Sequence, residues 1–192
     1  MSISLTKGQS VSHIKEAPQL TQVCFGLGWD PRRTAGVEFD LDASAFLLDA
    51  RGQVMSDQHF VFYNNPRDPR GAVVYSGDNR TGEGEGDDEQ IQVDLKGLEA
   101  QVVQVAFVVS IYQAEERRQN FGQVENAYIR ALDVDGNREL ARFDLSEDAA
   151  LATAMVFGEL RRRSGAWDFG AVGEPRPGGL AGVARSYGVR VG

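Results

Sequence analysis

Short apolar runs alternate with polar turn clusters along most of this chain. The runs are rich in β-branched and aromatic residues, and Gly, Asp and Asn residues separate them, which is typical of antiparallel strands. So many strands in one domain must stack into two layers, and the pattern therefore predicts an all-β fold, a two-layer antiparallel β-sandwich. The predicted strands are Gln22–Leu27, Val37–Leu48, His59–Tyr63, Ala72–Tyr75, Glu89–Leu95, Gln104–Tyr112, Ala127–Asp133, Arg138–Asp144, Ala154–Arg162 and Trp167–Val172.

Turn residues indicate how two of the strand pairs connect. The dipeptides Asp135-Gly136 and Ser164-Gly165 favour tight hairpin turns. Helix is scarce. A short helix is predicted at Gln113–Arg118, and another where apolar residues recur at helical spacing from Leu180 to Tyr187. We therefore expect short peripheral helices, one of them near the C-terminus.

Composition and charge bound the class of protein. The 192 residues include 42% hydrophobic types and 25% charged residues, as in a globular protein. This length suits one domain, spanning residues 1–192. The formal net charge is -8, from 28 acidic and 20 basic residues, and such a surface repels polyanions. We therefore expect no binding to nucleic acid.

Several features favour a soluble cytoplasmic protein. Cys24 is the only cysteine, so no intrachain disulfide can form, and the N-terminal residues lack the pattern of a signal peptide. The longest apolar stretch, Val102–Ile111, is interrupted by Gln104. It is much shorter than the ~20 residues of a spanning helix, so we expect no membrane insertion.

Carboxylates concentrate in one glycine-rich segment, Gly77–Glu89. Six acidic residues share this segment with one arginine, Arg80. A hard cation would relieve their mutual repulsion, and the glycines let the backbone curl and offer its carbonyls. Oxygen ligands on a flexible loop favour calcium over magnesium or zinc. The alternative is a solvated acidic turn between two strands.

Two other glycine-loop chemistries do not fit this segment. Asp78 to Glu89 has the length of an EF-hand loop, but Arg80 and Gly82 stand at ligand positions and Glu83 at the position that requires glycine. A phosphate-binding loop is excluded as well, because the acidic side chains would repel phosphate.

Neighbouring strands add further oxygen donors. Asp40 and Asp42 share one strand face, whereas Phe39 and Leu41 point to the other. The next strand ends at Asn65, and amide carbonyls suit calcium. Antiparallel pairing sets the start of one strand beside the end of the next, so these donors can meet. The alternative is that the aspartates only form the solvated face of a strand.

Distinctive blocks of residues occur in a fixed order along the chain. The blocks are Gly26–Asp30, Phe39–Phe46, Phe60–Asn65, Gly77–Gly82, Asp87–Glu89, Ile111–Tyr112, Asn120–Gly122, Ala127–Arg130, Phe157–Leu160, Trp167 and Tyr187–Val189. In identity and order they resemble the blocks of the TerD-like family of bacterial tellurium-resistance and stress proteins, over essentially the full length.

The resemblance implies a single calcium-binding domain that acts in resistance to tellurite and chemical damage, without a known reaction. The implied partners are other Ter-family proteins or an unknown protein. The acids exceed what one calcium ion needs with its ~6–8 oxygens, so we expect two ions. The metal role carries over to Asp78, Asn79, Glu83, Glu85, Asp87, Asp88 and Glu89 in the loop, and to Asp40, Asp42 and Asn65 outside it.

Candidate catalytic groups are few. His13 and His59 lie in no catalytic motif and are expected at the surface or at a strand end, and Cys24 lacks a basic neighbour. We therefore expect no enzyme activity, and calcium-dependent binding of a partner instead. One alternative is a metal-dependent hydrolase. Another is a small-ligand or nucleotide-binding module with anion contacts from Arg80, Arg117, Arg118 or Arg130.

Overall fold

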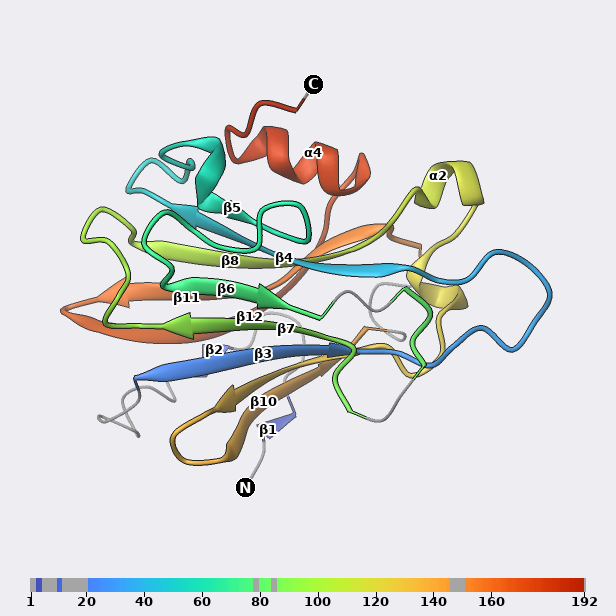
Figure 1. Cartoon of the computed structure of the whole chain (residues 1–192), viewed down its shortest axis with the longest axis horizontal. Coiled ribbons are helices and arrows are strands. Elements are labelled where there is room, and N and C mark those ends of the chain that lie inside the picture. The colour runs from blue at the N-terminus through green and yellow to red at the C-terminus, as the bar shows by residue number, and fades with distance from the viewer. Residues whose placement is uncertain are drawn as a thin grey trace.

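Two six-stranded sheets pack against each other in the computed structural model (Figure 1). The structure describes residues 3–4, 10–11, 21–77, 80–83, 86–145 and 151–191. Sheet A has the order β1 (Ile3–Ser4), β10 (Arg138–Asp144), β9 (Tyr128–Asp133), β3 (Gln22–Gly28), β7 (Glu89–Asp94) and β6 (Val73–Ser76). Sheet B has the order β2 (Ser10–Val11), β12 (Ala166–Pro175), β11 (Ala154–Arg163), β8 (Gln104–Ile111), β4 (Leu41–Leu48) and β5 (Phe60–Val61). The predicted two-layer β-sandwich is confirmed.

The N-terminal residues supply an edge strand to each sheet. β1 pairs with β10 in parallel, with Ile3 opposite Ala141, and β2 pairs with β12 in antiparallel orientation. The sequence pattern does not predict these strands, because two residues are too few to show a period. The remaining strand pairs are antiparallel, as predicted.

Both predicted hairpins are present. Asp133 pairs with Arg138 across the β9–β10 turn, and Arg163 pairs with Ala166 across the β11–β12 turn. In the second turn Ser164 and Gly165 have φ values of 48° and 81°. Left-handed backbone at both central positions matches the right-handed twist of the flanking strands.

Short helical segments lie outside the sheets. They are η1 (Asp57–His59), α2 (Ala114–Arg117), η2 (Phe121–Gln123) and α4 (Gly179–Ser186). α2 and α4 confirm the two predicted helices. Within the described ranges, no helix has the length and apolar character needed to cross a bilayer.

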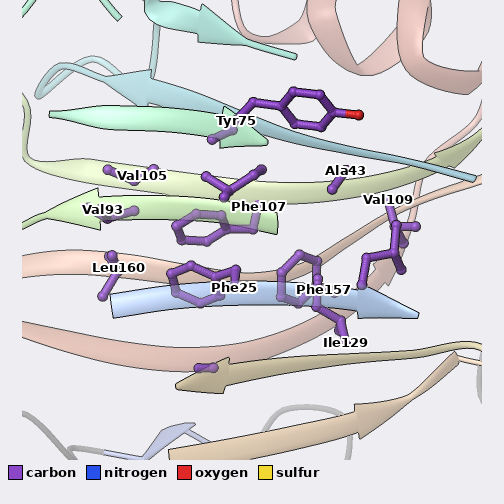
Figure 2. Packing of buried hydrophobic residues seen from close by; sticks show 14 of the residues in the cluster. Phe25, Ala43, Tyr75, Val93, Val105, Phe107, Val109, Ile129, Phe157 and Leu160 are labelled. Carbon is purple, nitrogen blue, oxygen red and sulfur yellow. The ribbon is translucent and has the colours of Figure 1, made fainter. Parts of the chain in front are cut away.

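Aromatic rings from both sheets meet in the core (Figure 2). Phe25 of β3 stacks on Phe107 of β8 with ring centroids 3.7 Å apart. Phe157 of β11 lies 6.2 Å from Phe25 and 5.9 Å from Phe107. The three rings therefore join the two layers through a large apolar contact.

Sheet B is covered on its outer face as well. Phe46 of β4 and Val108 of β8 belong to a second apolar cluster with Val183 and Ala184 of α4. Every residue of β4 is buried as a result. The second half of β4, Ala45–Leu48, is therefore continuously apolar, as expected for a strand that is covered on both faces.

The predicted strand Val37–Leu48 begins too early, because β4 starts at Leu41. The backbone carbonyls just before β4 accept hydrogen bonds from a side chain and not from a neighbouring strand. Gln119 Nε2 donates hydrogen bonds to the carbonyls of Val37 and Glu38, at 2.9 and 3.1 Å. These contacts satisfy backbone groups that a strand would pair in a ladder.

Candidate functional site

Asp40 and Asp42 meet at a small polar cavity at the start of β4. Leu41, which lies between them, is fully buried in the core, so the predicted alternation of faces is confirmed. The cavity has a volume of about 110 Å³ and is lined by Asp40, Asp42, Tyr63, Arg80 and Tyr112. Arg80 belongs to the acidic loop, so the loop reaches the two aspartates through a basic residue, and none of the described loop acids lines this cavity.

The two aspartates have different surroundings. Asp42 is 4% exposed and lies opposite Ser110 of β8. Asp40 precedes the strand, and its Oδ2 lies 3.8 Å from Nη1 of Arg117 on α2. The Arg117 guanidinium also lies over the Tyr112 ring, 5.0 Å from its centroid. Two positive side chains, Arg80 and Arg117, therefore lie near the two carboxylates.

Trp29 joins the acidic loop to the strand that carries the aspartates. Gly82 has a φ of 73°, and a Cβ at this position would lie 2.6 Å from Trp29 Nε1. Glycine is therefore required by both the backbone and the close approach. The same Nε1 donates a hydrogen bond to the carbonyl of Phe39 at 3.1 Å. Because Phe39 directly precedes Asp40, one indole ring contacts both segments.

Glu89 is buried between the sheets at the end of the loop. The residue is only 1% exposed. Oε2 accepts a hydrogen bond from the Ala43 N–H of β4 at 2.6 Å, and Oε1 accepts one from the Tyr75 hydroxyl of β6 at 2.7 Å. β5 pairs only with Ala45 and Phe46 of β4, so it does not reach Ala43. The Glu89 carboxylate therefore accepts the Ala43 N–H hydrogen bond that a longer edge strand could have accepted.

Asp87 lies against Gly26 of β3, on the side of sheet A opposite Phe25. Its side chain is 1% exposed, and Oδ1 lies 2.7 Å from Arg130 Nε. The Tyr128 hydroxyl donates a hydrogen bond to the same oxygen at 3.1 Å. A Cβ at Gly26 would overlap the carboxylate. The absence of a side chain at Gly26 thus makes room for this ion pair.

Two further loop acids, Asp88 and Glu83, differ in their surroundings. Asp88 Oδ2 accepts a hydrogen bond from the Trp29 N–H at 2.9 Å, and the Asp88 N–H donates one to the Leu27 carbonyl at 2.8 Å. Glu83 is exposed, and its backbone N–H donates a hydrogen bond to Thr81 Oγ1 at 3.3 Å. Asp88 is thus bound to the β3 end, and Glu83 faces solvent.

The remaining candidate donors lie apart from this cavity or outside the described residues. The Asn65 amide donates hydrogen bonds to the carbonyls of Gln58 and Phe60, at 3.1 and 2.7 Å, and closes its own turn. The ranges that the structure describes contain no group of three or more His, Cys, Asp or Glu side chains arranged to hold a metal ion. Outside the described residues lie Asp78, Asn79 and Glu85.

The described histidine and the cysteine lie away from the Asp40–Asp42 cavity. His59 precedes β5, as expected for a strand-end residue, but it is only 6% exposed. Its Nδ1 lies 2.9 Å from Ser56 Oγ, and its Nε2 lies 3.5 Å from Glu99 Oε1. Burial raises the pKa of the Cys24 thiol to about 11, so this thiol is protonated at neutral pH. His13 lies outside the described residues.

Sequence reasoning missed several residues around the site. Trp29 and Tyr75 bind the loop ends, and Tyr112 lines the cavity. No motif marks such contacts, since the chemistry of an aromatic residue does not show which polar group it will meet. Of the arginines considered as anion contacts, Arg80 and Arg117 lie near the aspartates, whereas Arg130 binds Asp87.

Comparisons with known proteins agree with the fold and with the family resemblance. A family model described as TerD domain matches residues 1–187. The chain is 53% identical over 189 residues to tellurium resistance protein TerD of Alcaligenes sp, covering 98% of each chain. It is 49% identical over 193 residues to general stress protein 16U of Bacillus subtilis (strain 168), covering 100% of each chain. A crystal structure of a homologue of telluride resistance protein (TerD) from Streptomyces coelicolor A3(2) superposes with a TM-score of 0.71 and 26% identity, covering 84% of this chain and 94% of that chain.

The packing of Asp87 over Gly26 predicts coupled stability effects. Gly26→Ala should lower the free energy of unfolding by about 1–3 kcal/mol, because the added methyl displaces the carboxylate from Arg130. In an Asp87→Ala background the same change should cost less, with a coupling energy of about 0.5–3 kcal/mol. Urea denaturation of the four proteins measures both values. An equal cost of Gly26→Ala in both backgrounds would contradict the contact.

Tyr128 should make stability fall in the alkaline range. Burial, together with the negative charge of Asp87, raises the pKa of Tyr128 from its ordinary value of 10.0 to about 12. Because the folded protein favours the neutral phenol, this stabilisation is complete below pH 10.0 and is lost as the pH rises toward about 12. Tyr128→Phe should remove a late step from the absorbance titration of the tyrosines and flatten the decline of stability in this window. Burial also raises the pKa of Tyr187, so a late step from Tyr187 should remain in the variant.

Proposed function

The chain belongs to the TerD family, and we propose that it is a non-enzymatic calcium-binding protein of the cytoplasmic stress response. The names of its relatives refer to tellurium resistance and general stress. The proposal extends this role to the present chain, as resistance to tellurite and to chemical damage through calcium-dependent binding of a protein partner.

The observation that supports calcium binding most is that Asp40 and Asp42 line one cavity, which the acidic loop reaches through Arg80. Carboxylate oxygens are the donors that calcium prefers. The volume of about 110 Å³ leaves room for an ion with water molecules, each of which takes about 30 Å³ in the liquid. Two carboxylates provide at most four oxygens, fewer than the ~6–8 that calcium takes. The other donors would come from the loop and from water.

The acidic residues divide into two groups under this proposal. Asp87 and Glu89 hold the loop to the sheets through their hydrogen bonds to Arg130, Tyr75 and Ala43. The proposed ligands are Asp40, Asp42, Asp78, Asn79, Glu83, Glu85 and Asp88, with enough oxygens for two adjacent ions. Asn65 ranks below them, because its amide group already closes a turn.

The environments of the reactive groups support a role without catalysis. The raised pKa of Cys24, about 11, keeps the thiol in its weakly nucleophilic form. His59 is buried beside Ser56 and Glu99 and does not line the Asp40–Asp42 cavity. A general base must lie within hydrogen-bond reach of its substrate, and this histidine does not face the proposed ions.

Calcium should stabilise the protein much more than magnesium does. Binding to the folded state alone contributes about 2.7 kcal/mol at a hundredfold excess over the dissociation constant. Magnesium should contribute less, since it demands tighter octahedral geometry. Thermal unfolding of chelator-treated protein, with calcium or magnesium added back, measures the difference.

The double variant Asp40→Asn/Asp42→Asn should keep its fold and lose most of the calcium-dependent stabilisation. Asp57→Asn is a matched control, because Asp57 is an exposed acid that pairs with Arg190. Calcium titrations of the three proteins by calorimetry test the assignment. Unchanged calcium affinity in the double variant would refute the role of these two aspartates.

Partner binding should depend on calcium, because the ion changes the charge of the loop surface. An ion acts as a switch only when the partner distinguishes the two states. The proposed partners are other Ter-family proteins or a further bacterial protein. Affinity capture from a bacterial lysate should recover a partner with calcium, and should lose it with chelator or with the Asp40→Asn/Asp42→Asn variant. Identical partner sets under all conditions would rule out the switch.

A further inference from the structure

A second, larger cleft lies on the outer face of sheet B, beside the start of α4. It has a volume of about 440 Å³, within the ~300–1,000 Å³ of small-molecule sites. Its walls come from β4, the β5 turn, the end of β8, α2 and the first turn of α4. These elements are far apart in sequence, so the fold itself builds the cleft.

Aromatic and aliphatic side chains form one wall of this cleft. Phe60 and Phe62 stack with centroids 4.2 Å apart and an interplanar angle of 6°, and Tyr63 meets Phe62 edge-on at 5.1 Å. All three rings line the cleft, together with Leu180 of α4. Phe60 is itself stacked between Phe62 and Phe46, so an apolar ligand group would pack against the ring edges of this wall and against Leu180.

Ser110 places a polar atom in the cleft. The residue is 1% exposed and lines the cleft beside Asp42, its partner in the β4–β8 pairing. Within the described residues, Ser110 Oγ has no hydrogen-bond partner. A buried hydroxyl without a hydrogen-bond partner destabilises the folded protein. A ligand group that forms a hydrogen bond with Ser110 would remove this penalty.

The charges around the cleft have one sign. Asp42, Glu115 and Glu116 line it, and none of its described lining residues is Lys or Arg. Arg117 follows these glutamates, but its guanidinium lies by Asp40 and over Tyr112. Three carboxylates at one cleft attract a cation through charge.

We infer that this cleft binds a small amphipathic amine. The ammonium group lies between Asp42 and the two glutamates of α2 and donates a hydrogen bond to Ser110 Oγ. The apolar body packs against Phe60, Phe62 and Leu180. This inference goes beyond calcium binding, although Asp42, Tyr63 and Tyr112 line both cavities, so its test leaves these three residues unchanged.

Three probes with the same ring and similar length separate charge from apolar contact. They are 2-phenylethylammonium, 2-phenylethanol and 3-phenylpropanoate, titrated into chelator-treated full-length protein by calorimetry. The cation should bind about tenfold more tightly than the neutral alcohol, the ratio that corresponds to ~1.4 kcal/mol of charge interaction. The anion should bind more weakly than the alcohol. Equal affinities for the three probes would overturn the proposal.

Variants of the lining residues test whether the probes bind in this cleft. Glu115→Gln/Glu116→Gln changes only exposed side chains and should weaken binding of the cation several-fold, with no change for the alcohol. Glu174→Gln is the matched control, because Glu174 is an exposed acid on β12 that pairs with Arg176. Ala181→Phe should fill the cleft and weaken both the cation and the alcohol. Unaltered cation affinity in Glu115→Gln/Glu116→Gln would overturn the proposed site.

Calcium titration of the same variants separates this inference from the proposed function. Glu115→Gln/Glu116→Gln should keep the calcium affinity of the parent, whereas Asp40→Asn/Asp42→Asn should lose it. Amine binding with no calcium binding would support the cleft alone. Calcium binding with equal affinities for the three probes would leave the metal site standing and refute the amine site.

Discussion

The buried carboxylate of Glu89 connects the two sheets at the point where the acidic loop rejoins the sandwich. It accepts one hydrogen bond from the backbone of β4 in sheet B and one from Tyr75 in sheet A. A buried carboxyl group is costly without hydrogen-bond partners, so the bond to Tyr75 helps to stabilise the contact that Glu89 makes between β7 and β4. Ala43, the β4 donor, directly follows Asp42. The buried bond between Glu89 and Ala43 therefore helps to hold Asp42 in place at the candidate site.

Further contacts hold the loop at its base. Asp87 binds Arg130 and Tyr128 on the outer side of sheet A, and Gly82 packs on the indole of Trp29. A loop held in this way has less conformational freedom to lose when a ligand binds. Some carboxylates of the loop thus build the framework that presents others. This division explains why an acid-rich segment contributes two nearly inaccessible side chains, Asp87 and Glu89.

The sequence predicted the sandwich well and the site in part. Regular spacing of apolar residues is a local signal, and it marked the long strands, both hairpins and both helices. It also placed Asp40 and Asp42 on one face. The burial of Glu89 and the pairing of Asp87 with Arg130 depend on residues 46 and 43 positions away. Such contacts follow from the tertiary packing and not from the local period, so the sequence of the loop does not show which of its acids are buried.

The two edge strands at the N-terminus have a consequence for the way the protein folds during synthesis. β1 and β2 leave the ribosome long before their partners β10 and β12, which end at Asp144 and Pro175. Neither edge can close until most of the chain has emerged, because loops of this length must form before the pairing stabilises them. Until then, strands along both open edges expose unpaired backbone groups. The nascent chain therefore passes through a long interval in which contact with a chaperone would prevent association with other chains.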